Sequence, residues 1–254
     1  MMTNKNSDNM LIKLFPALFW IAVWQILSVV VNNKLLIVSP FEVCKNLLSK
    51  AVDSIFWSAV VFSSLRIIGG FMTALIFGGF LASLASKLAF VRSLAAPVIV
   101  AIKTVPVASF IILILICFPS RNLSFIISFL MVLPIIYMNL LTGLVCVDKS
   151  LLEMAQVFNI SLARRILYIY LPHLLPYFRS ACTVSLGLCW KSGVAAELIG
   201  VPVGSVGEGL YHSKIYLDMP ELFSWTLVVV ILSICFERIF LSVVNFVCER
   251  LRRV

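Results

Sequence analysis

Charged side chains are scarce in this sequence of 254 residues. Asp, Glu, Lys and Arg make up 12% of it, whereas they make up about 25% of an ordinary soluble domain. Hydrophobic residues account for 62%, and the mean hydropathy is +1.10. One globular core cannot hide this excess, so the composition excludes a soluble enzyme, a disordered chain and a fibrous repeat. It predicts an all-α, polytopic membrane protein built as a helical bundle.

Residues that hold metals or form disulfides are few or unsuitably spaced. His173 and His212 are the two histidines, and the seven cysteines lie mostly in apolar runs without a C-x-x-C pair. We therefore expect neither a metal site nor a disulfide framework. The sequence also has no G-x-x-x-x-G-K-[ST] phosphate loop, so ATP hydrolysis by that route is not expected of this chain.

Six apolar segments approach the length that a bilayer demands, which is about 20 residues for a helix. They lie at approximately 14–31, 60–85, 93–118, 123–147, 176–200 and 222–247. We expect about six transmembrane helices in a single domain over residues 1–254, with an additional first helix at 14–31 and a five-helix core at 60–247. No small-residue cleavage site follows the first segment, so it is expected to be a retained helix rather than a signal peptide.

The distribution of cationic residues predicts the topology. With the N-terminus inside, the inner segments contain eleven of them: Lys5, Lys13, Lys87, Arg92, Lys149, Arg164, Arg165, Arg179, Arg250, Arg252 and Arg253. The outer segments contain five: Lys34, Lys45, Lys50, Arg121 and Lys214. This excess predicts that both termini are cytoplasmic, because positive loops stay inside. It also accounts for the net charge of +9 without nucleic-acid binding, for which no basic and aromatic stripe is present.

Small residues recur at every fourth position of the second apolar segment. They are Gly70, Ala74, Gly78, Ala82 and Ser86. On a helix they form one flat stripe that lets another backbone approach closely. The stripe is interpreted as internal packing, with a seam between subunits as the alternative.

A short surface helix is predicted after the first segment, where the sequence reads Ser39-Pro40-Phe41-Glu42. Serine as cap, proline at the first helical position and glutamate three residues after the serine form a capping box. Phe41, Cys44 and Leu48 share one side of this helix, so we expect it to lie along the outer membrane surface.

The longest inner loop, residues 148–175, is predicted to be a structured cytoplasmic knob. Ser150 and Glu153 form a second capping box, which starts a helix that runs to about Phe158. Asn159 is placed to end it in the left-handed conformation. Ser161 is expected to cap a second helix, which Pro172 terminates or redirects. Such a rigid projection is suited to docking into a partner.

The same loop resembles the EAA loop of ABC importer permeases. The matching residues are Glu153, Met154, Ala155, Asn159, Ile169, Leu171 and Pro172, with Met154 and Asn159 replacing the family's usual Ala and Gly. Other motifs are similar to the permeases of nitrate, sulfonate and taurine importers: Ser39-Pro40, Ser64-Leu65-Arg66 with Gly70-Phe71, Val105-Pro106 with Ala108, and Trp190 through Ala196-Glu197 to Gly204 and Gly207. Phe118-Pro119-Ser120-Arg121 departs from the family's Phe-Gly-x-Gly, so the outer mouth is expected to differ.

The resemblance implies a type I importer fold and a coupling role for residues 148–175. It implies two separate ABC ATPase subunits that bind ATP and Mg, an extracytoplasmic solute-binding protein, a second permease copy and a bacterial inner-membrane location. A homodimer is expected, because two ATPases need two coupling loops; a heterodimer with a related permease is the alternative. Glu153 is predicted to contact the ATPase besides capping its helix, and Arg164 is either a second contact or a topology signal.

Ionisable residues inside apolar segments are costly and mark candidate pathways. The candidates are three ionisable residues, Lys103, Lys191 and Glu197, and two residues close to them, Pro106 and Trp190. Pro106 is expected to bend its helix beside Lys103, and either lysine could attract an anion. The alternative for both lysines is a paired or neutralised group that serves packing. Glu197 lies six residues after Lys191, which is about 600° around a helix, so these two residues do not pair within a straight helix. Pairing with Lys103 on the neighbouring segment is one alternative, and a gate or a contact with the following glycine-rich loop is the other.

The leading hypothesis is therefore the membrane subunit of an ATP-driven importer for a small organic or inorganic anion of the sulfonate, taurine or nitrate type. An importer of vitamin precursors, such as thiamine pyrimidines or riboflavin, is an alternative. An ATP-independent transporter predicts an inverted repeat, which we do not find. A membrane enzyme needs clustered polar catalytic groups, for which the sequence offers little.

Overall fold

The computed structural model describes residues 5–33 and 36–252, with side chains for residues 15–16, 18–33 and 36–246. Lys34 and Arg253, two of the residues that predict the topology, lie outside the described residues. The described part of the chain contains helices and no strand, so the all-α prediction is confirmed. The elements in chain order are α1 Lys5–Val31, α2 Pro40–Lys50, α3 Ser54–Lys87, α4 Ala89–Thr104, α5 Val107–Cys117, η1 Ser120–Asn122, α6 Leu123–Val145, α7 Lys149–Val157, α8 Leu162–Arg165, η2 Ile166–Tyr170, α9 Leu171–Gly200, α10 Val206–Ile215 and α11 Met219–Arg252.

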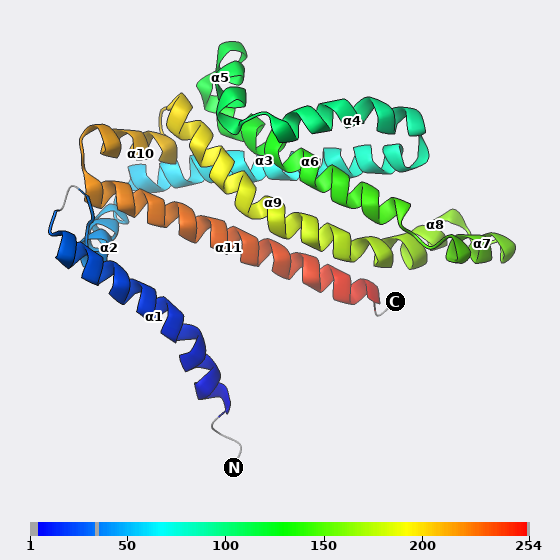
Figure 1. Ribbon diagram of the computed structural model, residues 1–254, viewed down its shortest axis with the longest axis horizontal. Coiled ribbons are helices and arrows are strands. Elements are labelled where there is room, and N and C mark those ends of the chain that lie inside the picture. The colour runs from blue at the N-terminus through cyan, green and yellow to red at the C-terminus, as the bar shows by residue number, and fades with distance from the viewer. Residues whose placement is uncertain (1–4, 34–35, 253–254) are drawn as a thin grey trace.

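Three long helices form the centre of the bundle. Helix α6 packs against α3 and against α9, and α11 lies along α9 (Figure 1). Phe71 of α3, Ile127 of α6 and Leu186 of α9 are at most 1% exposed. The short helices α7 and α8 project from one end of the long axis, whereas α2 and α10 lie at the other end (Figure 1).

The stripe of small residues on α3 packs inside the protein. A Cβ atom added at Gly70 would stand 2.4 Å from the carbonyl oxygen of Phe125, and one at Gly78 would stand 3.1 Å from Ile136 Cγ2. Both contacts are with α6, so the small residues let two helical backbones approach closely. The interpretation as internal packing is confirmed.

Three described helical segments are long and apolar enough to cross a membrane: Ser54–Lys87, Ser120–Val145 and Met219–Phe246. The predicted interruption of the span at 93–118 is confirmed, since α4 and α5 are bent by 107° at Pro106. Proline has no backbone N–H and keeps the preceding residue extended, as Val105 is. Counted as one broken span, this pair makes four. The predicted span at 14–31 lies in α1, where the apolar helical stretch Leu18–Val31 is shorter. The predicted span at 176–200 lies in α9, which has 30 residues and carries Arg179, Lys191 and Glu197.

The predicted surface helix is present as α2. The hydroxyl of Ser39 accepts a hydrogen bond of 3.2 Å from the backbone N–H of Glu42, and Pro40 is the first helical residue. This capping of the first turn is confirmed. Phe41, Cys44 and Leu48 are exposed, whereas Val43 is buried, so α2 presents an apolar side away from the bundle.

Candidate functional site

The projecting unit formed by α7, the turn at residues 158–161 and α8 is called the knob below. Its first helix begins two residues earlier than predicted, because Asp148 caps it instead of Ser150. Asp148 Oδ1 accepts hydrogen bonds from the backbone N–H of Ser150 at 2.9 Å and from its hydroxyl at 2.8 Å. A carboxylate at this position is also favoured by the helix dipole, and these hydrogen bonds hold the pKa of Asp148 below its usual range. The predicted capping box of Ser150 and Glu153 is therefore wrong.

The turn of the knob has the geometry that the sequence predicts. Asn159 adopts a φ of 52°, which is the left-handed region that asparagine tolerates. The backbone N–H of Ile160 donates to the carbonyl of Ala155 at 3.0 Å, and that of Asn159 donates to Gln156 at 3.0 Å. These bonds satisfy the last carbonyls of α7 and end the helix.

Arg165 secures the turn, which sequence reasoning did not predict. Its Nε donates to the carbonyl of Ile160 at 2.9 Å, and one terminal nitrogen donates to the carbonyl of Ala155 at 3.1 Å. Ala155 itself is fully buried. A basic residue close after a helix end is a usable signal, because cationic side chains often bind the final carbonyls. The neighbouring Arg164 is exposed.

The sequence predicts that Pro172 terminates or redirects the second helix, and termination is wrong, because the knob continues into α9. A π-helical turn, Ile166–Tyr170, joins α8 to α9, and Leu171 and Pro172 are the first two residues of α9. Proline has no backbone N–H to donate within a helix, and here it lies two residues after the π-helical turn. Ser161 has the extended backbone of a cap, but its side chain forms no capping hydrogen bond.

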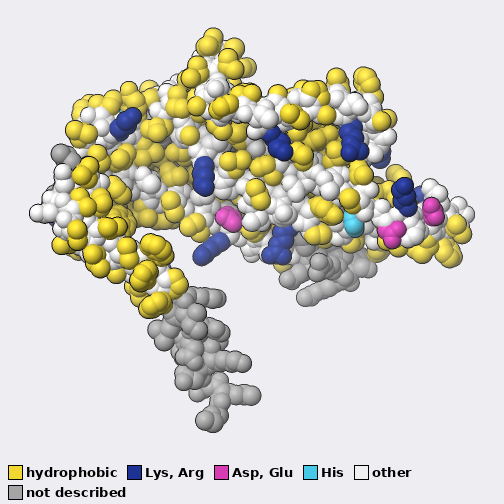
Figure 2. Space-filling model, viewed as in Figure 1, with side chains coloured by type: hydrophobic (Ala, Val, Ile, Leu, Met, Phe, Trp, Pro, Cys, Tyr) yellow, Lys and Arg dark blue, Asp and Glu magenta, His cyan; other side chains and the backbone are white. Residues whose placement is uncertain are grey.

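Large apolar side chains cover the tip of the knob. Val157 is 77% exposed, Phe158 72% and Leu162 68%. Met154 and Glu153 are also exposed. Figure 2 shows hydrophobic side chains at this end of the molecule beside basic and acidic ones. An apolar patch rimmed by charges is typical of a protein interface.

The five predicted pathway residues do not share one surface. Lys103 and Lys191 are exposed, and Pro106 lies at the bend between α4 and α5. Trp190, by contrast, is 2% exposed and lies 6.4 Å from the ring of Phe236. Glu197 is fully buried, so in this conformation neither Trp190 nor Glu197 faces the space that the lysines face.

Glu197 joins three helices at the end of the bundle opposite the knob. Its Oε2 accepts hydrogen bonds from the hydroxyl of Ser63 on α3 at 2.6 Å and from the backbone N–H of Gly207 on α10 at 3.3 Å. Among the described residues, no ion pair links it to either lysine. Of the two alternatives for Glu197, the structure therefore shows the contact with the glycine-rich segment and not the pair with Lys103. The loop reverses the chain through Val201 and Gly204, whose φ angles are 41° and 75°.

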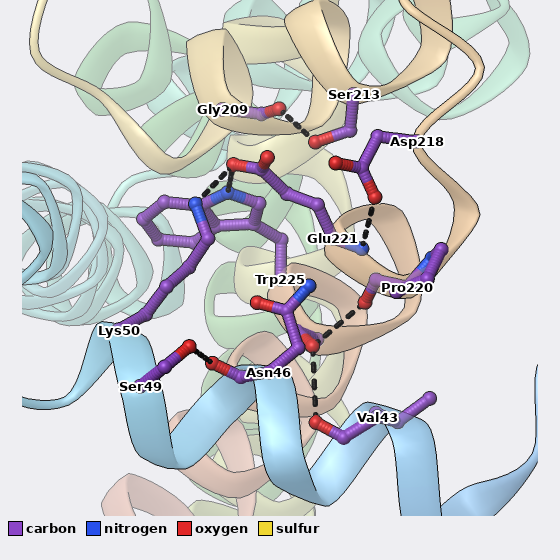
Figure 3. A network of polar contacts seen from close by, with 11 residues as sticks. Val43, Asn46, Ser49, Lys50, Gly209, Ser213, Asp218, Pro220, Glu221 and Trp225 are labelled. Carbon is purple, nitrogen blue, oxygen red and sulfur yellow. Dashed lines mark hydrogen bonds and ion pairs between the residues drawn. The ribbon is translucent and has the colours of Figure 1, made fainter.

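A second polar cluster holds α2 against the start of α11 (Figure 3). Lys50 Nζ forms an ion pair with Glu221 Oε1, and Trp225 Nε1 donates to the same oxygen at 3.2 Å. The hydroxyl of Ser224 donates to the carbonyl of Val43 at 3.2 Å. From the sequence, Lys50 is only one of the cationic residues of the outer segments. Its partner is 171 residues away, and no local pattern marks the pair.

Residues 74–253 match the sequence pattern of a protein family. The description of this family is "Binding-protein-dependent transport system inner membrane component". The matched region contains the knob, α9 and α10, and therefore Glu197 and Gly207, whereas Ser63 precedes it. The chain belongs to this family. It is therefore the permease of an ABC importer, a membrane-embedded subunit that is not itself an enzyme, in a family whose members work with ATPase and solute-binding partners.

Three relatives each match about three quarters of the permease. The taurine transport system permease protein TauC of Escherichia coli (strain K12) is 27% identical over 202 residues, which are 74% of this chain and 72% of TauC. The nitrate import permease protein NrtB of Synechococcus elongatus is 25% identical, over 76% of this chain and 73% of NrtB. A probable ABC transporter permease protein of Haemophilus influenzae is 26% identical, over 78% and 80% respectively.

Proposed function

We propose that this permease forms the solute pathway of an ATP-driven importer and that the knob docks into a separate ATPase. The supporting observation is the apolar tip of the knob, where Phe158 and Val157 are more than two-thirds exposed. Water-facing aromatic and branched side chains at a rigid projection are poorly explained unless a partner covers them. One chain supplies one knob, so two ATPases, which bind ATP and Mg, pair with two permease copies, in our proposal a homodimer.

The continuous path from the knob to α9 supports a lever-like coupling. Helix α9 is 30 residues long, which corresponds to about 45 Å at 1.5 Å per residue. Its far end carries Glu197, whose hydrogen bonds hold α10 and α3. A movement of the knob on ATP binding is therefore transmitted along a rigid element to the opposite end of the bundle. We assign that end to the outer side of the membrane and both termini to the cytoplasm. An extracytoplasmic solute-binding protein then delivers solute to the outer end.

The proposed solute is a small organic or inorganic anion. Two relatives are named as permeases for taurine and for nitrate. In this chain, Lys103 and Lys191 are exposed on helices of the membrane bundle. A lysine is strongly disfavoured against lipid tails, so a polar pathway is the favourable surrounding for both.

The test compares two apolar-to-acidic variants in purified complexes. The permease is co-expressed with an ABC ATPase from the same organism, and the subunit ratio and ATPase activity are measured in nanodiscs. Phe158→Glu places a charge on the knob, whereas Val203→Glu, at a position 84% exposed at the opposite end, is the matched control. We expect two ATPases per permease pair in the wild type and in Val203→Glu, and loss of the ATPase in Phe158→Glu. Retention of the ATPase by Phe158→Glu overturns the docking proposal.

A further inference from the structure

A groove lies beside the bend at Pro106, between residues of α4, α6 and α9. Its volume is about 450 Å³, and most of its lining surface is apolar, from residues such as Ile135, Met138 and Val184. Its polar groups belong to Lys103 of α4, Asn139 and Thr142 of α6, and Tyr177 of α9. The α6 residues belong to the last turns before the knob, so the groove lies in the half of the bundle nearer the knob. Nothing in the family assignment or in the contacts described above explains it.

The ammonium group of Lys103 has no carboxylate partner there. The contact found for Lys103 Nζ is with the sulfur of Met138 at 3.4 Å, and a thioether is a weak acceptor. Within the described residues, no ion pair of Lys103 is present. An unneutralised cation that also lacks a good neutral acceptor is suited to bind an anion.

The other polar groups of the groove are mainly donors. Asn139 donates one amide hydrogen to the carbonyl of Ile135 at 2.8 Å, which leaves its second N–H available. No hydrogen bond of the Tyr177 hydroxyl is found among the described residues, so it too is available. Thr142 already donates to the carbonyl of Met138 at 2.8 Å and contributes no further donor. Two neutral donors beside an ammonium match the several acceptor oxygens of a sulfonate or nitrate group.

The groove opens onto a face of α9 that carries a second cation. Tyr177, Val184 and Lys191 are spaced by seven residues, which is 20° short of two full turns, so they share one side of the helix. Val184 and Lys191 are exposed. Lys191 lies about 10 Å farther along the helix, toward the Glu197 end. Glu197 itself is buried among α3 and α10, so it does not cancel the positive potential of this face.

We infer that the groove is an anion-binding subsite on the inner half of the pathway, in which Lys103, Asn139 and Tyr177 hold the oxoanion group of a small solute. This inference rests on the proposed importer function, because a pathway must keep this surface wet. A solute moving inward from the outer end then passes the cationic side chain of Lys191 before it reaches the subsite. The subsite is specific for the oxoanion group and leaves the rest of the solute to the space between subunits.

The test measures how fast a cysteine in the groove reacts with reagents of opposite charge. Val184→Cys is introduced into a permease whose exposed and undescribed cysteines are serine, while buried Cys182 and Cys189 are kept. The replaced positions are Cys44, Cys117, Cys146, Cys235 and Cys248. The probes are 2-sulfonatoethyl methanethiosulfonate, itself an alkyl sulfonate, and its trimethylammonioethyl counterpart. The control is Val230→Cys on α11, at a position 47% exposed that we place against lipid.

For Val184→Cys we expect the ratio of anionic to cationic reaction rates to fall about fivefold or more when Lys103→Gln is added, from the attraction between unit charges a few ångströms apart in water. Lys103→Arg should keep the ratio, and Val230→Cys should react slowly with both probes. A ratio that Lys103→Gln leaves unchanged, or a cysteine at 184 that neither probe modifies, overturns the subsite. ATPase co-purification is measured on the same samples, so a retained ATPase with an unchanged ratio refutes the subsite alone.

Discussion

The hydroxyl of Ser63 donates a hydrogen bond of 2.6 Å to Glu197 Oε2, and the same hydroxyl accepts one of 3.0 Å from the backbone N–H of Val206. Two side chains that are both fully buried thereby join α3, α9 and α10. The contact lies at the end of α9 far from the knob, where it helps to hold the start of α10 against α3 and α9.

Glu197→Ala removes the acceptor of both Ser63 and the Gly207 N–H. Each buried donor left unpaired costs about 1–3 kcal/mol, so we expect a clear loss of thermal stability in the purified permease. Glu197→Gln keeps an acceptor oxygen and should cost about 1 kcal/mol or less. Thermal unfolding monitored by tryptophan fluorescence in nanodiscs measures both. Equal destabilisation by the two variants would show that the carboxylate charge, not the hydrogen bonds, holds the cluster.

Gly207 is fitted closely against Glu197, which gives a second prediction. A Cβ atom added at position 207 would stand 2.2 Å from Glu197 Cβ and 2.4 Å from its carbonyl carbon. Gly207→Ala should therefore displace α10 and lower both stability and transport. Gly187→Ala is the matched control, since nothing lies within 4 Å of its Cβ position and alanine favours the helix by about 1 kcal/mol. Similar melting temperatures for the two variants would contradict the close packing.

The features that sequence reasoning found are those set by local chemistry. The Ser39 cap, the left-handed Asn159 and the bend at Pro106 each follow from a few adjacent residues. The Ser63–Glu197 and Lys50–Glu221 contacts join residues 134 and 171 positions apart, and no local pattern encodes them. Sequence reasoning chose Ser150 as the cap because its spacing to Glu153 fits a capping box. Asp148, which is the actual cap, is also a good capping residue and lies within the same turn.

Arg165 is expected to hold the knob turn, and its neighbour provides the control. Arg165→Ala removes two hydrogen bonds to the carbonyls of Ile160 and Ala155, which should lower local stability by about 1–3 kcal/mol. Arg164→Ala removes an exposed arginine and should leave the turn unchanged. Hydrogen exchange measured by mass spectrometry over residues 155–161 distinguishes them. Equal exchange in both variants would exclude a structural role for Arg165.

The cap at Asp148 predicts an acid-sensitive start of α7. Hydrogen bonds from Ser150 hold the pKa of Asp148 below its ordinary value of 3.8. The stabilisation is therefore fully present above that value and is lost as the pH falls through the lower, folded-state pKa. We expect protection factors of the first α7 amides to be constant between pH 5 and pH 8, a range far above both pKa values, and to fall in stronger acid. Asp148→Asn should abolish this fall, and a fall that persists in the variant would assign it to another group.

Native cysteines at the two ends of the bundle can test the proposed orientation. Cys44 lies on α2 and Cys146 directly after α6, before the knob, and both are exposed. A membrane-impermeant maleimide is applied to cells with a permeable outer membrane, using permeases that keep only one exposed cysteine. Because the distribution of cationic residues predicts that the knob is cytoplasmic, we expect Cys44 to react at once and Cys146 only after the inner membrane is opened. The reverse order would invert the topology and place the knob out of reach of a cytoplasmic ATPase.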